Sequence, residues 1–237
     1  MKPIFRKYDV EKYKFKEMLK SLFEVENLDM VHTLDPELCA GEWALVRFDN
    51  EVKTFFHEKF YEKLREPWSE FIEAYEAFIE KEIAPVYGGK SFVYQTTPSF
   101  RVHVPNNKAV SLWHYDSDER HLHPDGEMNF ILPMTKAFDT SATWVETAPG
   151  KKDFVPLAME YGEYAQFHGN KCLHGNKVNA TGKTRVSFDF RVMKLEDYTP
   201  EKWDTESRSS ERSKAGTTKT KFVIGSYYSL YKGKEDV

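Results

Sequence analysis

Apolar side chains recur at intervals of three and four residues through the first part of the chain, which predicts amphipathic helices. One such stripe lies within residues 15–23 and consists of Phe15, Met18, Leu19, Leu22 and Phe23. A second runs from Trp68 to Ile83, between Pro67, which suits a first helical turn, and Pro85, where a helix is expected to stop. A third helix is expected over residues 53–64. Residues 1–87 are therefore predicted to form a mainly helical N-terminal segment.

After Gly88-Gly89 the pattern changes to short runs rich in β-branched and aromatic residues, separated by turn residues. Many short strands of this kind predict a β-sandwich or barrel rather than alternating βαβ units. We expect a mainly β protein with N-terminal helices, in which residues 88–237 form a double-stranded β-helix (jelly roll, cupin-like). The expected strands cover 91–96, 100–104, 110–114, 128–132, 142–146, 154–157, 164–167, 172–178, 184–192 and 222–228.

Nothing in the sequence divides it into two domains, so residues 1–237 are expected to form a single domain. Residues 197–221 contain many charged, Ser and Thr residues and predict a mobile loop. The formal net charge of −4 gives no electrostatic reason to expect a nucleic-acid partner. Two cysteines and the lack of a membrane-length apolar run predict a cytoplasmic protein without a membrane partner. A small-molecule substrate and a monomer or homodimer are expected.

Candidate chemistry begins at His114 and Asp116, which follow the apolar run 110–113. In a strand, residues i and i+2 point to the same side, so this imidazole and this carboxylate can face one point. A second, distant histidine would complete two histidines and one carboxylate on one face of a metal. This facial triad leaves coordination positions open and suits non-haem Fe(II).

His174 is the candidate for the third ligand because Arg185 follows it eleven positions later, across a Gly-containing turn. If 172–178 and 184–192 pair as a hairpin, Arg185 lies close to His174 and presents a planar guanidinium suited to a carboxylate. Ser187 would face the same side and add a hydroxyl. His168 is the alternative third ligand, but it has no Arg or Lys at the matching offset.

These motifs resemble the Fe(II)/2-oxoglutarate-dependent oxygenases, and more narrowly the streptomycin-biosynthesis-type (StrG-like) members, which are broadly related to phytanoyl-CoA dioxygenases. The similar stretches lie in the middle and C-terminal half of the chain: HYDSD (114–118), HPDGEMNFILPMT (123–135), TWVETAPGKKDFVPL (143–157), YGEYAQFHGNKCLHG (161–175) and TGKTRVSFDFRV (181–192). One departure is His168, where an Asn is expected in relatives.

The resemblance implies an enzyme that uses Fe(II), 2-oxoglutarate as co-substrate and O2 to oxidise a C–H bond of a small polar metabolite in biosynthesis. It implies that His114, Asp116 and His174 hold iron and that Arg185 holds the distal carboxylate of 2-oxoglutarate. The presence of Asp116 favours hydroxylation, desaturation or cyclisation over halogenation.

Further residues are weaker candidates for the same pocket. Asn129 is a candidate hydrogen-bond partner of the co-substrate. Inward-facing positions in β-rich runs make four residues candidates for substrate contacts: Arg101, Trp144, Glu146 and Arg191. Acidic residues near the metal strand would favour a cationic substrate: Asp118, Glu119, Asp125 and Glu127.

Two other functions compete with the oxygenase. His121, His123 and Glu127 have the spacing of a first cupin motif, which would make the protein a cupin-type metal enzyme that does not use 2-oxoglutarate. The second cupin motif and the expected glycines are absent from the sequence. The other alternative is a non-catalytic β-sandwich protein that binds a small molecule.

Overall fold

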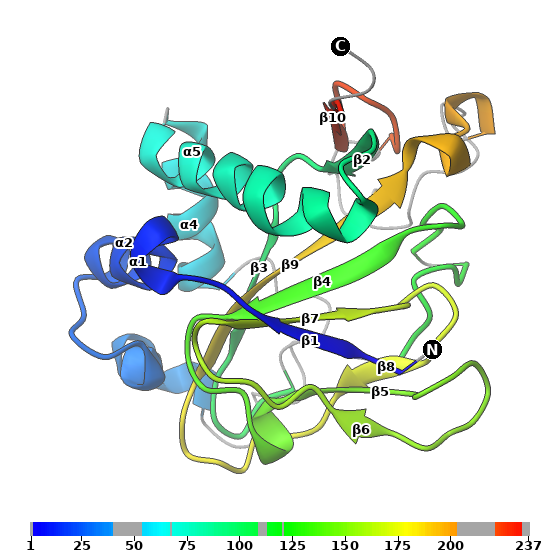
Figure 1. Ribbon diagram of the computed structural model, residues 1–237. Coiled ribbons are helices and arrows are strands. Elements are labelled where there is room, and N and C mark those ends of the chain that lie inside the picture. The colour runs from blue at the N-terminus through cyan, green and yellow to red at the C-terminus, as the bar shows by residue number, and fades with distance from the viewer. Residues whose placement is uncertain are drawn as a thin grey trace.

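A computed structural model describes residues 2–39, 54–66, 68–108, 113–119, 121–202 and 221–233. In these ranges the strands form a seven-stranded sheet and a three-stranded sheet. Within each sheet, the neighbouring strands pair in antiparallel orientation. The helices cover one face of the large sheet, and the small sheet lies on its other side (Figure 1). The expected mainly β architecture with N-terminal helices is confirmed, with two facing sheets as in a jelly roll and no closed barrel among the described strands.

The helical layer contains the three helices expected from the sequence, which are α2, α4 and α5, and the additional short helix α1. It comprises α1 (Val10–Tyr13), α2 (Phe15–Phe23), α4 (Phe55–Arg65) and α5 (Ser69–Phe78). The helix expected to end at Pro85 changes form instead. After α5 the chain makes a π-helical turn (Ile79–Ile83) and then a 3-10 turn (Ala84–Tyr87) that holds Pro85 in its first turn, where a missing N–H costs nothing. Further 3-10 turns span Leu28–Leu34 and Pro36–Cys39.

The large sheet has the order β1-β7-β4-β9-β2-β10, with β3 paired to β9 off this path. Its strands are β1 (Ile4–Lys7), β2 (Phe92–Gln95), β3 (Ser99–His103), β4 (Met128–Pro133), β7 (Glu163–Phe167), β9 (Arg185–Lys194) and β10 (Tyr228–Tyr231). The small sheet has the order β6-β5-β8, formed by β6 (Val155–Pro156), β5 (Thr143–Val145) and β8 (His174–Asn176). Short 3-10 turns at Asp139–Ser141, Leu195–Asp197 and Pro200–Lys202 complete the described elements.

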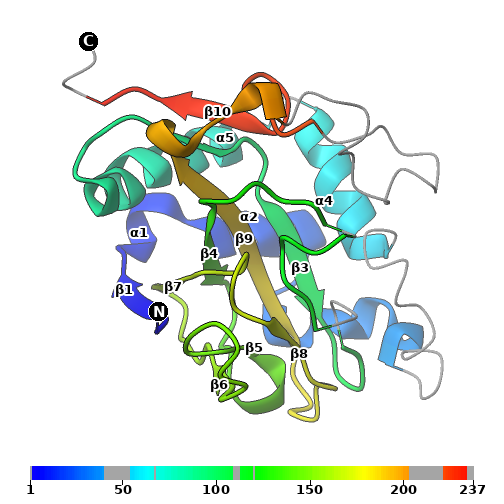
Figure 2. The ribbon, with the colours of Figure 1, turned by 90° about the vertical axis from the view of Figure 1, so that its right-hand side faces the viewer.

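Strand β9 runs through the middle of the molecule, where Figure 2 shows it between β3 and β4. Side chains alternate across a strand, so its residues form two rows. One row is apolar and packs against the helices: Phe188 contacts the rings of Phe60 and Phe71, with centroids 5.5 and 5.2 Å apart. The other row is polar although buried, and it consists of Arg185, Ser187, Asp189 and Arg191. The polar row faces the space between the two sheets.

The space between the sheets is partly filled by a second, smaller core. Ile131 of β4 and Phe167 of β7 pack there against Val145 of β5 and neighbouring apolar residues. The unfilled remainder lies beside this core, next to the polar row of β9, and forms the pocket described below.

Three strand predictions need correction. Residues 172–178 and 184–192 do not form a hairpin: β8 pairs with β5, while β9 pairs with β2, β3 and β4. The turn between β8 and β9 therefore carries the chain from one sheet to the other. The N-terminal segment contributes β1, an edge strand paired with β7. The expected strand over 222–228 is displaced, because β10 begins only at Tyr228.

Two other expectations fall largely outside the described residues. In the expected strand 110–114, residues 110–112 lie outside them, and His114 forms an isolated bridge with His174. Most of the expected loop over 197–221 lies outside them as well, because the description stops at residue 202 and resumes at 221.

Candidate metal centre

The predicted triad of His114, Asp116 and His174 comes together at the pocket, which the two histidines line. The backbones of His114 and His174 exchange two hydrogen bonds of 2.9 and 3.1 Å, which places the two rings side by side. The Nε2 atoms of the two histidines lie 3.4 and 3.6 Å from Oδ1 of Asp116. One ligand atom from each residue lies within 4.8 Å of the others, close enough for a single metal ion to bind all three.

His174 is held in the tautomer that a metal ligand requires. Its Nδ1 lies 3.1 Å from the carbonyl oxygen of Cys172, which can only accept, so Nδ1 carries the proton and Nε2 presents its lone pair. Burial lowers the pKa of His174 to about 4, and the neighbouring His114 and Arg191 act in the same direction, against the opposing effect of Asp116. The ring is therefore neutral at physiological pH.

Asp116 is buried, with two polar side chains fixing its carboxylate. Asn129 Nδ2 donates to Oδ2 over 2.6 Å, and the Arg191 guanidinium donates to both oxygens over 3.3 Å. Burial alone would raise the pKa of Asp116, but the charge of Arg191 and the hydrogen bond from His114 hold it well below its ordinary value. The carboxylate is thus ionised and oriented without a metal.

Asn129 lines the pocket and also contacts Asp116. Its side chain reaches the pocket, but its Oδ1 accepts a hydrogen bond from the backbone of Gly169 over 3.1 Å while its Nδ2 holds Asp116. Both ends of the amide therefore make hydrogen bonds within the protein, and Asn129 orients Asp116.

Arg185 lines the same pocket as His114 and His174, although the hairpin expected to bring it there does not form, and Ser187 contacts Arg185. The guanidinium of Arg185 is buried and donates to the backbone oxygen of Ser141 over 2.7 Å, to Asn176 Oδ1 over 3.3 Å and to the hydroxyl of Ser187. Thr143 donates to the same Asn176 oxygen over 3.2 Å. Arg185 is thus aimed by neutral oxygen atoms on three elements.

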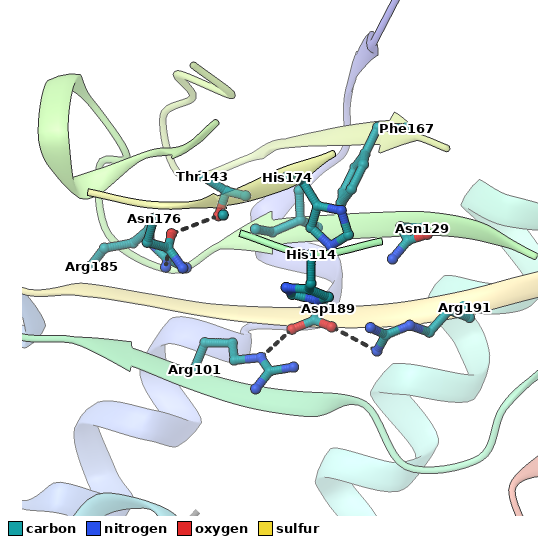
Figure 3. A pocket seen from close by; sticks show the side chains of 12 residues that line it. Arg101, His114, Asn129, Thr143, Phe167, His174, Asn176, Arg185, Asp189 and Arg191 are labelled. Atoms are coloured by element: carbon teal, nitrogen blue, oxygen red, sulfur yellow. Dashed lines mark hydrogen bonds and ion pairs between the residues drawn. The ribbon is translucent and has the colours of Figure 1, made fainter. Parts of the chain in front are cut away.

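The carboxylate of Asp189 links two of the arginines that line the pocket. Asp189 accepts from Arg101 Nε over 2.6 Å and from Arg191 Nη1 over 3.0 Å, so one carboxylate bridges two guanidinium groups (Figure 3). Burial would raise the pKa of Asp189, but the charges of Arg101 and Arg191 lower it. Both arginines line the pocket.

The pocket includes about 450 Å³ of space when its open mouth is counted, which suits a small molecule. Its walls come from both sheets, with the triad histidines and the arginines arranged around one space (Figure 3). The lining residues are Arg101, His114, Asn129, Ile131, Thr143, Phe167, His174, Gly175, Asn176, Arg185, Asp189 and Arg191.

Trp144 and Glu146 are not among the lining residues, contrary to expectation. The indole of Trp144 donates to the backbone of Asp139 over 3.3 Å, and Lys177 lies over its ring. Glu146 is buried and accepts backbone hydrogen bonds from Gly150, Lys152 and Leu173. These hydrogen bonds stabilise the loop after β5.

The histidines of the cupin alternative do not form a metal group. His121 pairs with Asp118 over 2.7 Å, and His123 pairs with Glu127 over 2.8 Å. Within the part of the chain that the structure describes, only His114, Asp116 and His174 gather as a possible metal group. His168, the alternative third ligand, lies outside that group.

Sequence reasoning missed Asp189, Asn176 and Thr143. A signal for Asp189 was present: residues 185, 187, 189 and 191 alternate with four apolar residues, which marks one polar face on a buried strand. Asn176 and Thr143 have no comparable pattern, because their position depends on the pairing of β5 with β8.

No protein-family profile matches the chain. The streptomycin biosynthesis protein StrG of Streptomyces griseus is 29% identical over 194 residues, which cover 82% of this chain and 86% of that protein. Among solved structures, the α-ketoglutarate-dependent carbocyclase SnoK from nogalamycin biosynthesis is 11% identical with a TM-score of 0.48, covering 70% of this chain and 74% of its own. The non-haem monooxygenase ThoJ in its nickel complex is 13% identical with a TM-score of 0.41, covering 82% and 73%.

Among the described residues, no helix combines the length and the apolar character that crossing a membrane requires. The similarity to StrG extends over most of both chains, well beyond the stretches that first suggested it. With the His114, Asp116 and His174 group in place, it confirms the resemblance to the StrG-like Fe(II)/2-oxoglutarate-dependent oxygenases that the sequence motifs predict.

Proposed function

We propose that this chain is a non-haem Fe(II)- and 2-oxoglutarate-dependent dioxygenase that oxidises a C–H bond of a small polar metabolite by hydroxylation, desaturation or cyclisation. One observation carries the proposal: two histidines and a carboxylate gather beside a pocket that a buried arginine also lines. The first group suits Fe(II), and the second suits the distal carboxylate of a dicarboxylate co-substrate.

The residues present fit Fe(II) in their chemistry. His114, Asp116 and His174 would hold the ion, because Asp116 is ionised and His174 already directs its lone pair toward the carboxylate. Fe(II) bound there would supply the oxidising chemistry, with 2-oxoglutarate and O2 as co-substrates and succinate and CO2 as co-products. The protein contributes binding, orientation and the exclusion of water.

Arg185 and Ser187 would bind the distal carboxylate of 2-oxoglutarate. Asn176 and the Ser141 carbonyl fix the plane of the Arg185 guanidinium, so little side-chain entropy remains to be lost on binding. Asn129 and Arg191 act as positioning residues, because each holds the carboxylate of Asp116 in place. Ile131 and Phe167 give the pocket an apolar wall that limits the access of water.

The similarity to StrG, whose name assigns it to streptomycin biosynthesis, supports a role in natural-product biosynthesis. The proposal places the enzyme in the cytoplasm, which is consistent with the free thiols of Cys39 and Cys172.

The test is an anaerobic titration of the metal-free protein with Fe(II) and then 2-oxoglutarate, followed by visible spectroscopy. We expect the charge-transfer band of a chelated complex, and we expect His174→Ala to abolish it while His168→Ala preserves it. His168→Ala is a matched control because this buried histidine lies near the pocket but outside the metal group.

Three other results would change the assignment. Loss of the band in His168→Ala alone would preserve the enzyme class and replace the third ligand. A metal-dependent activity that requires His121 and His123 and does not respond to 2-oxoglutarate would favour the cupin alternative. The lack of any band in the parent protein would overturn the oxygenase proposal and favour a binding protein.

A further inference from the structure

The backbone of Asp116 is held on both of its sides. Its N–H donates to the carbonyl oxygen of Gly169 over 3.0 Å, and its own carbonyl oxygen accepts from the backbone N–H of His123 over 2.9 Å. These two hydrogen bonds act on the peptide groups, whereas Asn129 and Arg191 act on the carboxylate. A ligand that is held at its backbone and at its side chain keeps a fixed position relative to the other ligands.

A buried carboxylate holds His123 in turn. The Nδ1 atom of His123 lies 2.8 Å from Oε2 of Glu127, and the hydroxyl of Tyr228 donates to the other oxygen, Oε1. Glu127 and Tyr228 are both fully buried. Each oxygen of the carboxylate therefore has a partner, which a carboxylate in this position requires because an unpaired one would be costly to bury.

The segment that leads into β10, residues 221–228, packs against the same histidine. The ring centroids of Phe222 and Tyr227 lie 4.8 and 5.7 Å from that of His123. Tyr228 is the first residue of β10, which pairs with β2 at the edge of the large sheet. Contacts therefore run from the edge of the sheet to the backbone that carries a metal ligand.

The proposed function has so far assigned no role to His123 and Glu127, although their spacing suggested a cupin motif. His123 lies outside the metal group, and Glu127 is not among the residues that line the pocket. Glu127 was also one of the acidic residues expected to favour a cationic substrate, but its two oxygens bind His123 and Tyr228 instead. Asn129, two residues after Glu127, holds the carboxylate of Asp116. The start of β4 thus reaches the same ligand by two routes.

Resting on the proposed function, we infer that His123 is a positioning residue of the metal centre, kept in place by Glu127 and by Tyr228 of the C-terminal segment. Asp116 supplies one of the three ligand atoms, so a shift of its backbone changes the distance from that atom to the two histidines. Releasing His123 therefore weakens the binding of Fe(II) without removing a ligand.

Two substitutions of His123 test this role in the full-length protein. Fe(II) affinity is measured by competition with a chelator, and the visible band is recorded in the anaerobic complex with Fe(II) and 2-oxoglutarate. His123→Ala should weaken Fe(II) binding by about 10-fold, the lower end of the loss expected for an outer partner of a metal ligand, and should shift or broaden the band. His123→Asn should restore most of the affinity, because its amide nitrogen takes the place of Nδ1 and can donate to Glu127.

Tyr228→Phe removes a single hydroxyl and keeps the ring. It should weaken Fe(II) binding in the same direction and add little to His123→Ala, because both substitutions act through Glu127. Tyr198→Phe is the matched control. Its hydroxyl accepts from the backbone N–H of Ile224 over 2.9 Å, so it anchors the same segment at a different point. This variant should keep the Fe(II) affinity and the band of the parent protein.

The outcomes separate the two proposals. No charge-transfer band in the parent protein defeats the proposed function itself. A normal parent band, with Fe(II) affinity and band unchanged in His123→Ala and Tyr228→Phe, overturns the positioning role and leaves the oxygenase in place. Equal losses in Tyr198→Phe and Tyr228→Phe, or no rescue by His123→Asn, also overturn it, because the segment would then only support the fold. If His123→Ala does not fold, the comparison of Tyr228→Phe with Tyr198→Phe still decides the question.

Discussion

Gly169→Ala should weaken metal binding although residue 169 contacts no metal. A Cβ at this position would lie 2.6 to 2.8 Å from the amide atoms of Asn129, where ordinary contact begins near 3.4 Å. The backbone of Gly169 does not have positive φ, so alanine itself introduces no strain there. Asn129 must therefore withdraw by about 0.8 Å, which breaks or bends its 2.6 Å hydrogen bond to Asp116.

The expected loss of Fe(II) affinity can be estimated from the hydrogen bond that Asn129 donates to Asp116. A hydrogen bond to a charged group contributes about 1.5–3 kcal/mol, and removing a partner that orients a metal ligand typically lowers metal affinity by about 10–100-fold. The assay is competition for Fe(II) against a chelator of known affinity, with urea unfolding to report stability separately. The decisive comparison is a double-mutant cycle with Asn129→Ala, which removes the side chain that the new methyl group would displace.

In that cycle Gly169→Ala should weaken the metal in the parent background and have little further effect when Asn129 is already alanine. Equal losses in both backgrounds would refute the reasoning, because they would show that the methyl group acts on something other than Asn129. Unchanged Fe(II) affinity in Gly169→Ala and in Asn129→Ala would refute the role of Asn129 itself.

The remaining predictions concern three other parts of the molecule. Arg185→Ala should weaken 2-oxoglutarate by about 2–5 kcal/mol while Fe(II) still binds, as measured by the two-step anaerobic titration, and unchanged 2-oxoglutarate affinity would contradict the assignment. Phe188→Ala should lower the free energy of unfolding in urea by about 3–5 kcal/mol, because its ring fills the space between β9 and the helices, whereas Ser187→Ala on the other face should mainly weaken 2-oxoglutarate. Burial lowers the pKa of His57 to about 3, helped by the charge of Arg101, so the unfolded chain takes up this proton first as the pH falls. The stability that neutral His57 provides is complete above pH 6.5 and is lost progressively below it, by about 2 kcal/mol at pH 5, and His57→Leu should reduce the pH dependence of unfolding by that amount. The same slope in both proteins would rule out His57 as its source.

Local patterns were sufficient to predict most of the elements. The stripes that predicted α2, α4 and α5 and the short β-branched and aromatic runs that predicted β2, β3 and β4 are properties of a single segment, which the sequence shows directly. The elements that were missed or displaced depend on distant partners. Strand β1 is a short edge strand that exists because β7 offers it a partner, and β10 begins at the residue where β2 can pair with it.

In the site, too, the residues that were predicted depend on local spacing, and those that were missed depend on distant partners. His114 and Asp116 were predicted because a strand places alternate residues on one side, and Arg185 was predicted because it follows His174 by eleven positions across a Gly-containing turn. The hairpin argument brought Arg185 to the pocket by a wrong route: β8 and β9 belong to different sheets, and they face each other across the pocket instead of pairing. No rule based on spacing reveals that Asn129 holds Asp116, because β4 and the segment that contains Asp116 meet only in the folded protein.

Two walls of the pocket, β9 and the segments that carry His114 and His174, should differ in local stability. Amide hydrogen exchange would measure this difference. Strand β9 has neighbours on both sides, with β4 along one edge and β2 and β3 along the other, so its amide protons should exchange only when much of the sheet opens. The opposite wall, called here the ligand wall, contains His114 and His174, and within the described residues two backbone hydrogen bonds join them. Coordination of one ion by both residues would act as an additional cross-link at this joint. Metal loading should therefore slow deuterium uptake at the ligand wall and leave β9 almost unchanged, so that the ion completes the pocket mechanically as well as chemically.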